Sequence, residues 1–135
     1  GIGGGIIIDG HMLEGKNGAG AEIGHMVIST NGQLCNCGRR GCFETYASAT
    51  ALIRNARVAM INNPNSLLWK VVDKPEKLDG MAFFDALAMN DKVAHIVFEQ
   101  YVEDLAEGLT NLANIFRPDA IILGGGISYR VDSLM

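Results

Sequence analysis

The spacing of apolar residues predicts one long amphipathic helix in the second half of the chain. Over residues 93–116, apolar side chains recur every three or four positions with charged residues between them, which is typical of a helix with one buried face. At a rise of 1.5 Å per residue such a helix is roughly 35 Å long. We expect Asn90-Asp91 to cap its start and Arg117-Pro118 to end it, because proline cannot continue a helix.

Shorter patterns predict the other elements. Asp9-Gly10 stands between two β-prone runs and indicates a β-hairpin over about residues 5–15, because both central residues of such a turn have positive φ. An alanine-rich stretch predicts a helix over 45–62, and residues 81–89 predict a shorter one. Residues 26–28 fit a short strand. Residues 67–72 fit either a short helix or a buried strand.

The end of the chain suggests the class of fold. Residues 120–123 are all apolar, so we expect a strand buried on both faces. Three glycines follow it directly. A helix, a short connection, a buried strand and a glycine turn together indicate an α/β architecture, with its functional edge at the carboxyl end of that strand.

Composition and charge exclude several classes of protein. The chain has 135 residues, of which 48% are hydrophobic and 19% charged, and its formal net charge is −4. This composition is typical of a single globular domain, and the charge makes nucleic acid an unexpected partner. There is no apolar stretch near the ~20 residues of a membrane-spanning helix. No signal segment opens the chain, and we expect a cytoplasmic location without membrane contact.

Three cysteines lie within eight positions, in the run CNCGRRGC, as Cys35, Cys37 and Cys42. An odd number cannot pair completely in disulfides, and thiolates beside glycines are suited to zinc. Tetrahedral zinc needs a fourth ligand, for which His25 is the candidate nearest in sequence. Four protein ligands leave no position for a reactive water, so the metal would be structural. The alternative is three buried thiols in a reducing compartment.

Two carboxylates and two glycine clusters complete the candidate chemistry. Glu22 and Glu44 flank the cysteine loop and could accept hydrogen bonds from sugar hydroxyls, or could simply be surface charges. The glycines at 1–5 and 124–126 could cradle phosphate with their backbone N–H groups, or could only form turns. Neither cluster has the spacing of a known nucleotide-binding glycine motif.

Four segments together resemble one family: GIGGGIIIDG, GAGAEIGH, CNCGRRGCFE and IFRPDAIILGGGIS. They are similar to the ROK family of repressors, open reading frames and kinases, and most of all to its bacterial glucokinases. The resemblance implies the actin-like ATPase (ribonuclease H-like) fold of sugar kinases, with two α/β lobes around a cleft. Residues 1–135 would be part of the C-terminal large lobe, with the N-terminal small lobe absent. The opening at Gly1, inside a glycine cluster, also suggests a piece of a longer protein.

The resemblance also implies a role for each candidate residue. The zinc ligands would be His25, Cys35, Cys37 and Cys42. The sugar hydroxyls would meet Glu22, His25 and Glu44. The nucleotide would meet Gly1, Gly3, Gly124, Gly125 and Gly126.

The implied reaction is the phosphorylation of glucose at its 6-hydroxyl by ATP with magnesium, a step of glycolysis. The general-base aspartate would lie upstream, so no catalytic residue is expected in this chain and the chain alone is expected to be inactive. Family members commonly self-associate, so a homo-oligomer is expected. Two alternatives remain open: a sugar-responsive repressor with an N-terminal helix-turn-helix, and a kinase for fructose, mannose or N-acetylmannosamine.

Overall fold

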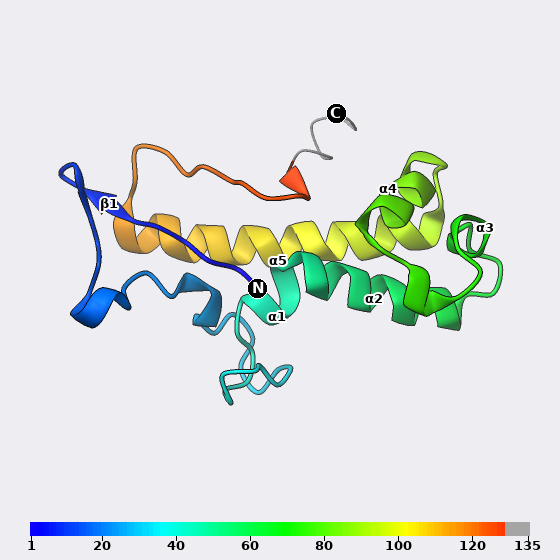
Figure 1. Ribbon diagram of the computed structural model, residues 1–135, viewed down its shortest axis with the longest axis horizontal. Helices are drawn as coiled ribbons and strands as arrows, with labels where there is room; N and C mark the ends of the chain where they lie inside the picture. Colours follow the sequence, from blue (N-terminus) through cyan, green and yellow to red (C-terminus); the bar gives the residue numbers. More distant parts are fainter. Residues whose placement is uncertain (129–135) are drawn as a thin grey trace.

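The longest helix forms the spine of the molecule. The computed structural model describes residues 1–128. In it α5 (Lys92–Phe116) extends along most of the long axis of the molecule (Figure 1). The Asp91 carboxylate accepts a hydrogen bond from the Ala94 N–H at 3.0 Å and so caps the first turn. Arg117 ends the helix in a left-handed conformation with φ 42°. The predicted helix and both of its ends are confirmed.

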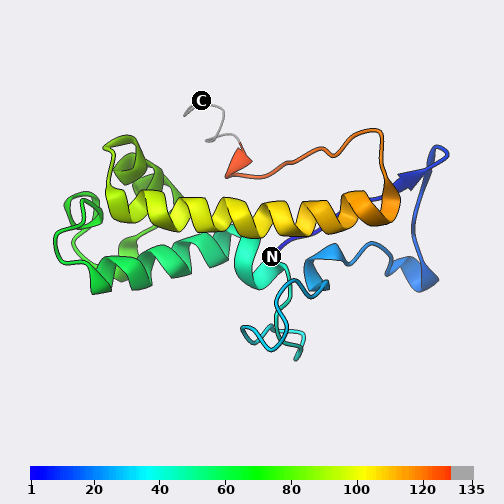
Figure 2. The ribbon, with the colours of Figure 1, turned by 180° about the vertical axis from the view of Figure 1, so that it is seen from behind.

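Two helices form where the sequence predicts one. The stretch contains α1 (Glu44–Ala47) and α2 (Ala49–Asn62), separated by Ser48 in an extended conformation. The Ser48 hydroxyl accepts a hydrogen bond from the Ala51 N–H at 3.1 Å, so this serine is the N-cap of a new helix. Figures 1 and 2 both show α2 lying beside α5 and running in the opposite direction.

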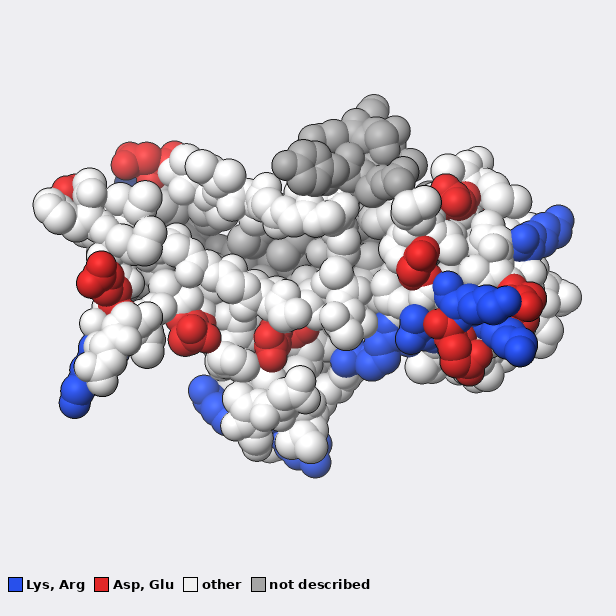
Figure 3. Space-filling view, in the orientation of Figure 1, with Lys and Arg blue, Asp and Glu red and all other residues white. Residues whose placement is uncertain are grey.

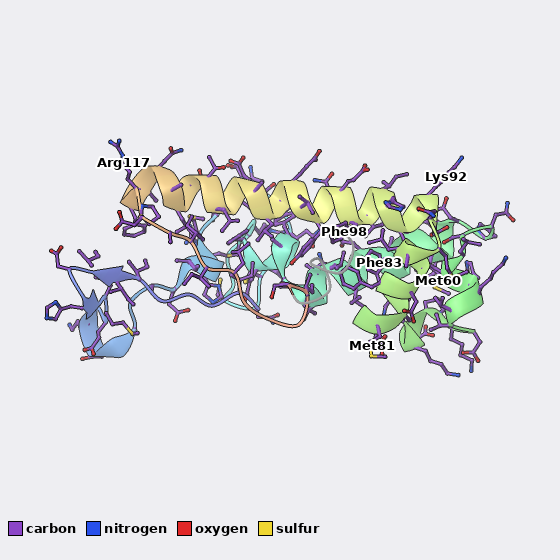
Figure 4. All side chains as sticks on the ribbon, turned by 90° about the horizontal axis from the view of Figure 1, so that it is seen from above. Met60, Met81, Phe83, Lys92, Phe98 and Arg117 are labelled. Atoms are coloured by element: carbon purple, nitrogen blue, oxygen red, sulfur yellow. The ribbon has the colours of Figure 1, made fainter. Side chains whose placement is uncertain are left out.

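One end of the molecule is a small helical core. Residues 67–72 form the helix α3 (Leu68–Val71), which settles the ambiguity left by the sequence, and α4 (Gly80–Ala88) follows a single 3-10 turn, η3 (Pro75–Lys77). The indole N–H of Trp69 donates to the Met60 carbonyl at 2.9 Å and ties α3 to α2. Figure 4 shows Met60, Phe83 and Phe98 between α5 and the other helices. The buried cluster consists of Leu52, Ala56, Met60, Leu68, Leu78, Phe83, Phe84, Ala86, Leu87, Ala94 and Tyr101.

A buried carboxylate joins three parts of this core. Besides capping α5, Asp91 accepts hydrogen bonds from the Ser66 hydroxyl at 2.8 Å and from the Leu67 N–H at 2.9 Å. The connection between α2 and α3 is therefore fastened to the start of α5. These bonds satisfy a charge that would otherwise be costly to bury.

The opposite end carries the predicted hairpin. Strand β1 (Ile7–Ile8) pairs with β2 (His11–Met12) in antiparallel register, with Ile7 opposite Met12. Asp9 and Gly10 have φ values of 51° and 77°, as the Asp-Gly turn requires. Two 3-10 turns follow, η1 (Lys16–Gly18) and η2 (Ile23–His25). Residues 26–28 form only a single bridge, between Val27 and Cys42, and not a strand.

The prediction of a buried strand over residues 120–123 is wrong in this structure. The segment is extended, but its residues are exposed, and Ile122 keeps 92% of its surface accessible. Within residues 1–128 it has no strand beside it. A strand is stabilised by its ladder partner, so an apolar run without one remains extended and uncovered.

The surface is unevenly charged. Lysine, arginine, aspartate and glutamate side chains gather at the end formed by α3 and η3 (Figure 3). There Lys77, the last residue of η3, pairs with Asp73 in the preceding connection at 2.8 Å. In the described part of the chain, no helix combines the length and the apolar character needed to cross a membrane.

Candidate functional site

Four potential metal ligands converge beside α1. The ligand atoms of His25, Cys35, Cys37 and Cys42 all lie within 4.8 Å of one another. Cys35 Sγ is 3.6 Å from His25 Nδ1, and the sulfurs of Cys37 and Cys42 are also 3.6 Å apart. All three cysteines are free thiols. The structure therefore brings together the set that the sequence spacing selected.

Glycine turns shape the loop that carries the thiols, which lies below α1 in Figure 1. The Gly38 N–H donates to the Cys35 carbonyl at 2.9 Å, and the Cys35 N–H donates to the Arg39 carbonyl at 2.8 Å. Gly38 has φ 86°, which a side chain rarely permits. At Gly41 a methyl group would overlap the Ser29 carbonyl. The loop thus folds back tightly enough to return Cys42 to its partners.

The three thiols differ in how readily they ionise. The pKa of Cys37 is lowered to about 7, chiefly because the backbone N–H of Arg39 hydrogen-bonds its sulfur. Burial raises the pKa of Cys42. For Cys35 the Cys37 N–H acts to lower the pKa, but burial and the neighbouring Glu44 carboxylate together raise it to about 12. A bound cation would favour the thiolate form of all three.

Glu44 is held against the metal-ligand cluster. It is the first residue of α1, and its Oε1 lies 3.2 Å from Cys35 Sγ and 3.9 Å from His25 Nδ1. Its side chain is only 18% exposed. The pKa of Glu44 is lowered, first because the Cys35 thiol donates to it and also because the backbone N–H of Ile2 does. The carboxylate is therefore a fixed, ionised acceptor.

Glu22 stands on the other side of the imidazole. Its Oε2 lies 4.0 Å from His25 Nε2, and its side chain is 70% exposed. One ring nitrogen of His25 thus faces Cys35 and Glu44, while the other faces Glu22. Two carboxylates around an imidazole form a group of acceptors that suits a ligand with several hydroxyls.

The two glycine clusters lie in different surroundings. A methyl group at Gly1 would come 2.8 Å from Glu44 Oε2, so this cluster adjoins the site. Gly3 follows it and is exposed. Gly124, Gly125 and Gly126 are exposed on the segment that follows α5, where the Ser128 hydroxyl donates to the Gly125 carbonyl at 2.7 Å.

Sequence reasoning missed two residues that support the site. The Tyr46 hydroxyl, on α1, accepts a hydrogen bond from the Gln33 N–H at 2.7 Å and holds the cysteine loop against the helix. Phe43, which stands between Cys42 and Glu44 in the sequence, is buried, and its ring lies against Gly108 of α5. The available signal was Gly108 itself, because an isolated glycine within a helical pattern often marks close packing.

Comparison with known proteins gives a consistent result. The whole chain, residues 1–135, matches the model of the ROK family. A glucokinase from Thermotoga maritima is 44% identical over 128 residues, which are 95% of this chain and 40% of that relative. A xylose repressor from Bacillus spizizenii is 36% identical over 127 residues, which are 94% of this chain and 29% of the repressor.

A solved structure agrees with the sequence comparison. A ROK family glucokinase from Streptomyces griseus, in complex with glucose and AMPPNP, superposes with a TM-score of 0.88 at 37% identity. The match covers 95% of this chain and 42% of the glucokinase chain. The chain thus spans about two fifths of the length of the glucokinases that it matches.

Proposed function

Because the chain belongs to the ROK family and has the actin-like ATPase fold of its sugar kinases, we propose that its protein phosphorylates glucose at the 6-hydroxyl with ATP. The observation that carries the proposal is the placement of Glu22 and Glu44 on opposite sides of the His25 imidazole. The identity with a glucokinase, and the likeness to a glucokinase bound to glucose, support it. In that protein residues 1–135 would form part of the large lobe.

In the proposed reaction this chain binds and orients the sugar. Glu22 and Glu44 accept hydrogen bonds from the ring hydroxyls, and His25 presents Nε2 to the same ligand. Fixing the ring fixes the direction of the 6-hydroxyl, and phosphoryl transfer depends mainly on such positioning and on electrostatic stabilisation. The general-base aspartate would come from a part of the protein outside this chain.

The glycine clusters would serve the phosphate donor. Backbone N–H groups at Gly1 and Gly3 would approach the phosphates of ATP from the sugar side. Gly124, Gly125 and Gly126 would line the nucleotide side. Glycine suits both places because the absence of a side chain lets the backbone come close to an anion. Magnesium bound between the phosphates would neutralise the charge that develops on them.

We further propose that the ligand cluster holds a structural zinc ion. The observed sulfur separation of 3.6 Å matches a tetrahedron with Zn–S bonds of about 2.3 Å, whose edges are about 3.8 Å. Three sulfurs and one imidazole nitrogen are a donor set that zinc prefers. His25 Nδ1, Cys35, Cys37 and Cys42 would hold the ion, which would keep the loop closed and Glu44 in place.

Substitution of Glu44 in the full-length protein tests the proposed function. Glu44→Gln is expected to lower kcat/KM for glucose by about 10- to 100-fold, because hydrogen bonds to a charged acceptor contribute about 1.5–3 kcal/mol each. The matched control is Glu76→Gln, because Glu76 is an exposed carboxylate in η3. This variant should keep full activity. Equal activity of the two variants would contradict the role of Glu44. A kcat/KM for fructose, mannose or N-acetylmannosamine well above that for glucose would overturn the choice of sugar.

One observation favours a second candidate function. The xylose repressor aligns with nearly the whole of this chain, so a sugar-responsive repressor would fit the same residues. Such a protein would bind a sugar without ATP turnover and would carry a DNA-binding segment. The full-length sequence and an assay of ATP-dependent sugar phosphorylation distinguish the two functions.

A further inference from the structure

The first residues of the chain lie directly against the turn that carries Glu22 and His25. A methyl group added at Gly4 would overlap Cδ1 of Ile23 and lie 2.8 Å from its Cγ1. A methyl group at Gly24 would overlap the Ile2 carbonyl and lie 3.3 Å from the Ile2 Cβ. The glycine segment 1–4 therefore packs closely against the turn at two places, with Gly4 on Ile23 and Ile2 on Gly24.

The turn itself has little freedom to adjust. Ala21 has a left-handed backbone with φ 59°, unusual for a residue with a side chain. The Ile23 N–H donates to the Ala21 carbonyl at 2.7 Å, and Glu22 between them has φ −71° and ψ 53°, an inverse γ-turn. The Ile23 carbonyl then accepts from the Met26 N–H at 3.1 Å. A shift of Ile23 must therefore carry Glu22 and His25 with it.

We propose that Ile23 is a positioning residue that couples the binding of the phosphate donor to the binding of the sugar. The inference rests on the proposed function, which places phosphate at Gly1 and Gly3 and sugar at Glu22 and His25. A phosphate donor fixes the glycine segment, and the Ile23 side chain transmits this position to the two sugar-binding residues. By linkage, bound sugar must raise the affinity for the phosphate donor by the same factor by which the donor raises the affinity for the sugar.

The coupling is measured in the full-length protein as a ratio of two dissociation constants. Calorimetric titration gives the Kd for glucose with and without a non-hydrolysable ATP analogue. The wild-type protein is expected to bind glucose about 5- to 150-fold more tightly when the analogue is present. Ile23→Ala, which removes the side chain that meets Gly4, is expected to bring this ratio close to one.

A size swap separates the contact from general damage to the fold. Gly4→Val combined with Ile23→Ala moves the lost volume to the other side of the same contact and is expected to restore much of the coupling. Gly5→Val combined with Ile23→Ala is the control, because a side chain at Gly5 meets no atom within 4 Å. This control variant should not restore the coupling. Metal content and melting temperature confirm that each variant is folded.

The outcomes distinguish the inference from the proposed function. If the wild-type protein binds no glucose, the proposed function fails and the inference falls with it. If the wild-type protein binds glucose but the analogue does not change its Kd, or if Ile23→Ala keeps the wild-type ratio, the proposed function stands and the inference is overturned. Rescue by the Gly5 variant as complete as by the Gly4 variant would also overturn it.

Discussion

At the scale of single residues, Asp104 on α5 carries a charge in partly buried surroundings. Burial raises the pKa of its carboxyl; the Gln100 amide, 3.3 Å away, acts in the opposite direction, and the charge of Glu103 adds to the rise. A carboxyl with a raised pKa in the folded state binds more protons there than in the unfolded chain. Its effect on stability is therefore unfavourable at neutral pH and disappears as the pH falls below the unfolded pKa of about 3.9.

Asp104→Asn is accordingly expected to increase the free energy of unfolding at neutral pH, by up to about 0.5 kcal/mol. The difference from the wild-type chain should vanish in acid, where both side chains are neutral. Urea unfolding at several pH values measures this. Glu99→Gln removes the same charge from an exposed position of the same helix that does not act on Asp104, and it is the control; a gain for Asp104→Asn that persists in acid would contradict the explanation.

The candidate site was predictable at this scale only where chemistry and spacing coincide. Three thiols within eight positions restrict the choice of metal ligands strongly, and the structure brings all three together with His25. The contact of Ile23 with Gly4 leaves no such pattern, and for the contact of Phe43 with Gly108 the sequence offers only the isolated glycine and not its partner. Both contacts depend on how two distant backbones approach each other, and this is decided by packing at the level of one methyl group.

At the scale of the elements, the contact between α5 and the start of α1 is sensitive to one substitution. Gly108→Ala would gain about 1 kcal/mol of helix propensity, but its methyl group would overlap the buried ring of Phe43. Overpacking of this kind costs about 1–3 kcal/mol, so the variant is expected to be destabilised in urea unfolding. Adding Phe43→Leu should recover part of the loss. A Gly108→Ala variant more stable than the wild-type chain would show that the two helices separate easily.

Elements with a purely local cause were predicted well. The period of α5 and the positive φ values of Asp9-Gly10 are dictated by neighbouring residues. The break at Ser48 was missed because an alanine-rich run hides a serine cap. The run 120–123 has the composition of a buried strand, but a strand also requires a partner that the run itself cannot specify.

At the scale of the whole molecule, stability has two separate sources. The apolar cluster lies among α2, α3, α4 and α5, whereas the loop of residues 26–43 contains only two isolated bridges. Zinc binding can contribute about 10–16 kcal/mol to such a small unit. The loop is therefore expected to depend on the metal and the helical core to depend on burial.

Chelation of the metal tests this division. Amide hydrogen exchange over residues 25–45 is expected to become fast after treatment with a chelator, while α2 and α4 keep their protection. Re-addition of zinc should restore the protection of the loop. Uniform loss of protection would show one cooperative unit, and unchanged exchange in the loop would contradict the metal's structural role.

Because of Trp69, the fluorescence of the chain reports on the helical core and not on the cysteine loop. It is the single tryptophan of the chain, and its indole is fastened to Met60 at the helical end, far along the sequence from the thiols. Intrinsic fluorescence therefore monitors the docking of α3 on α2. A sample whose cysteine loop has unfolded could still show the tryptophan fluorescence of the native protein. Fluorescence alone is therefore an unsafe criterion of an intact preparation.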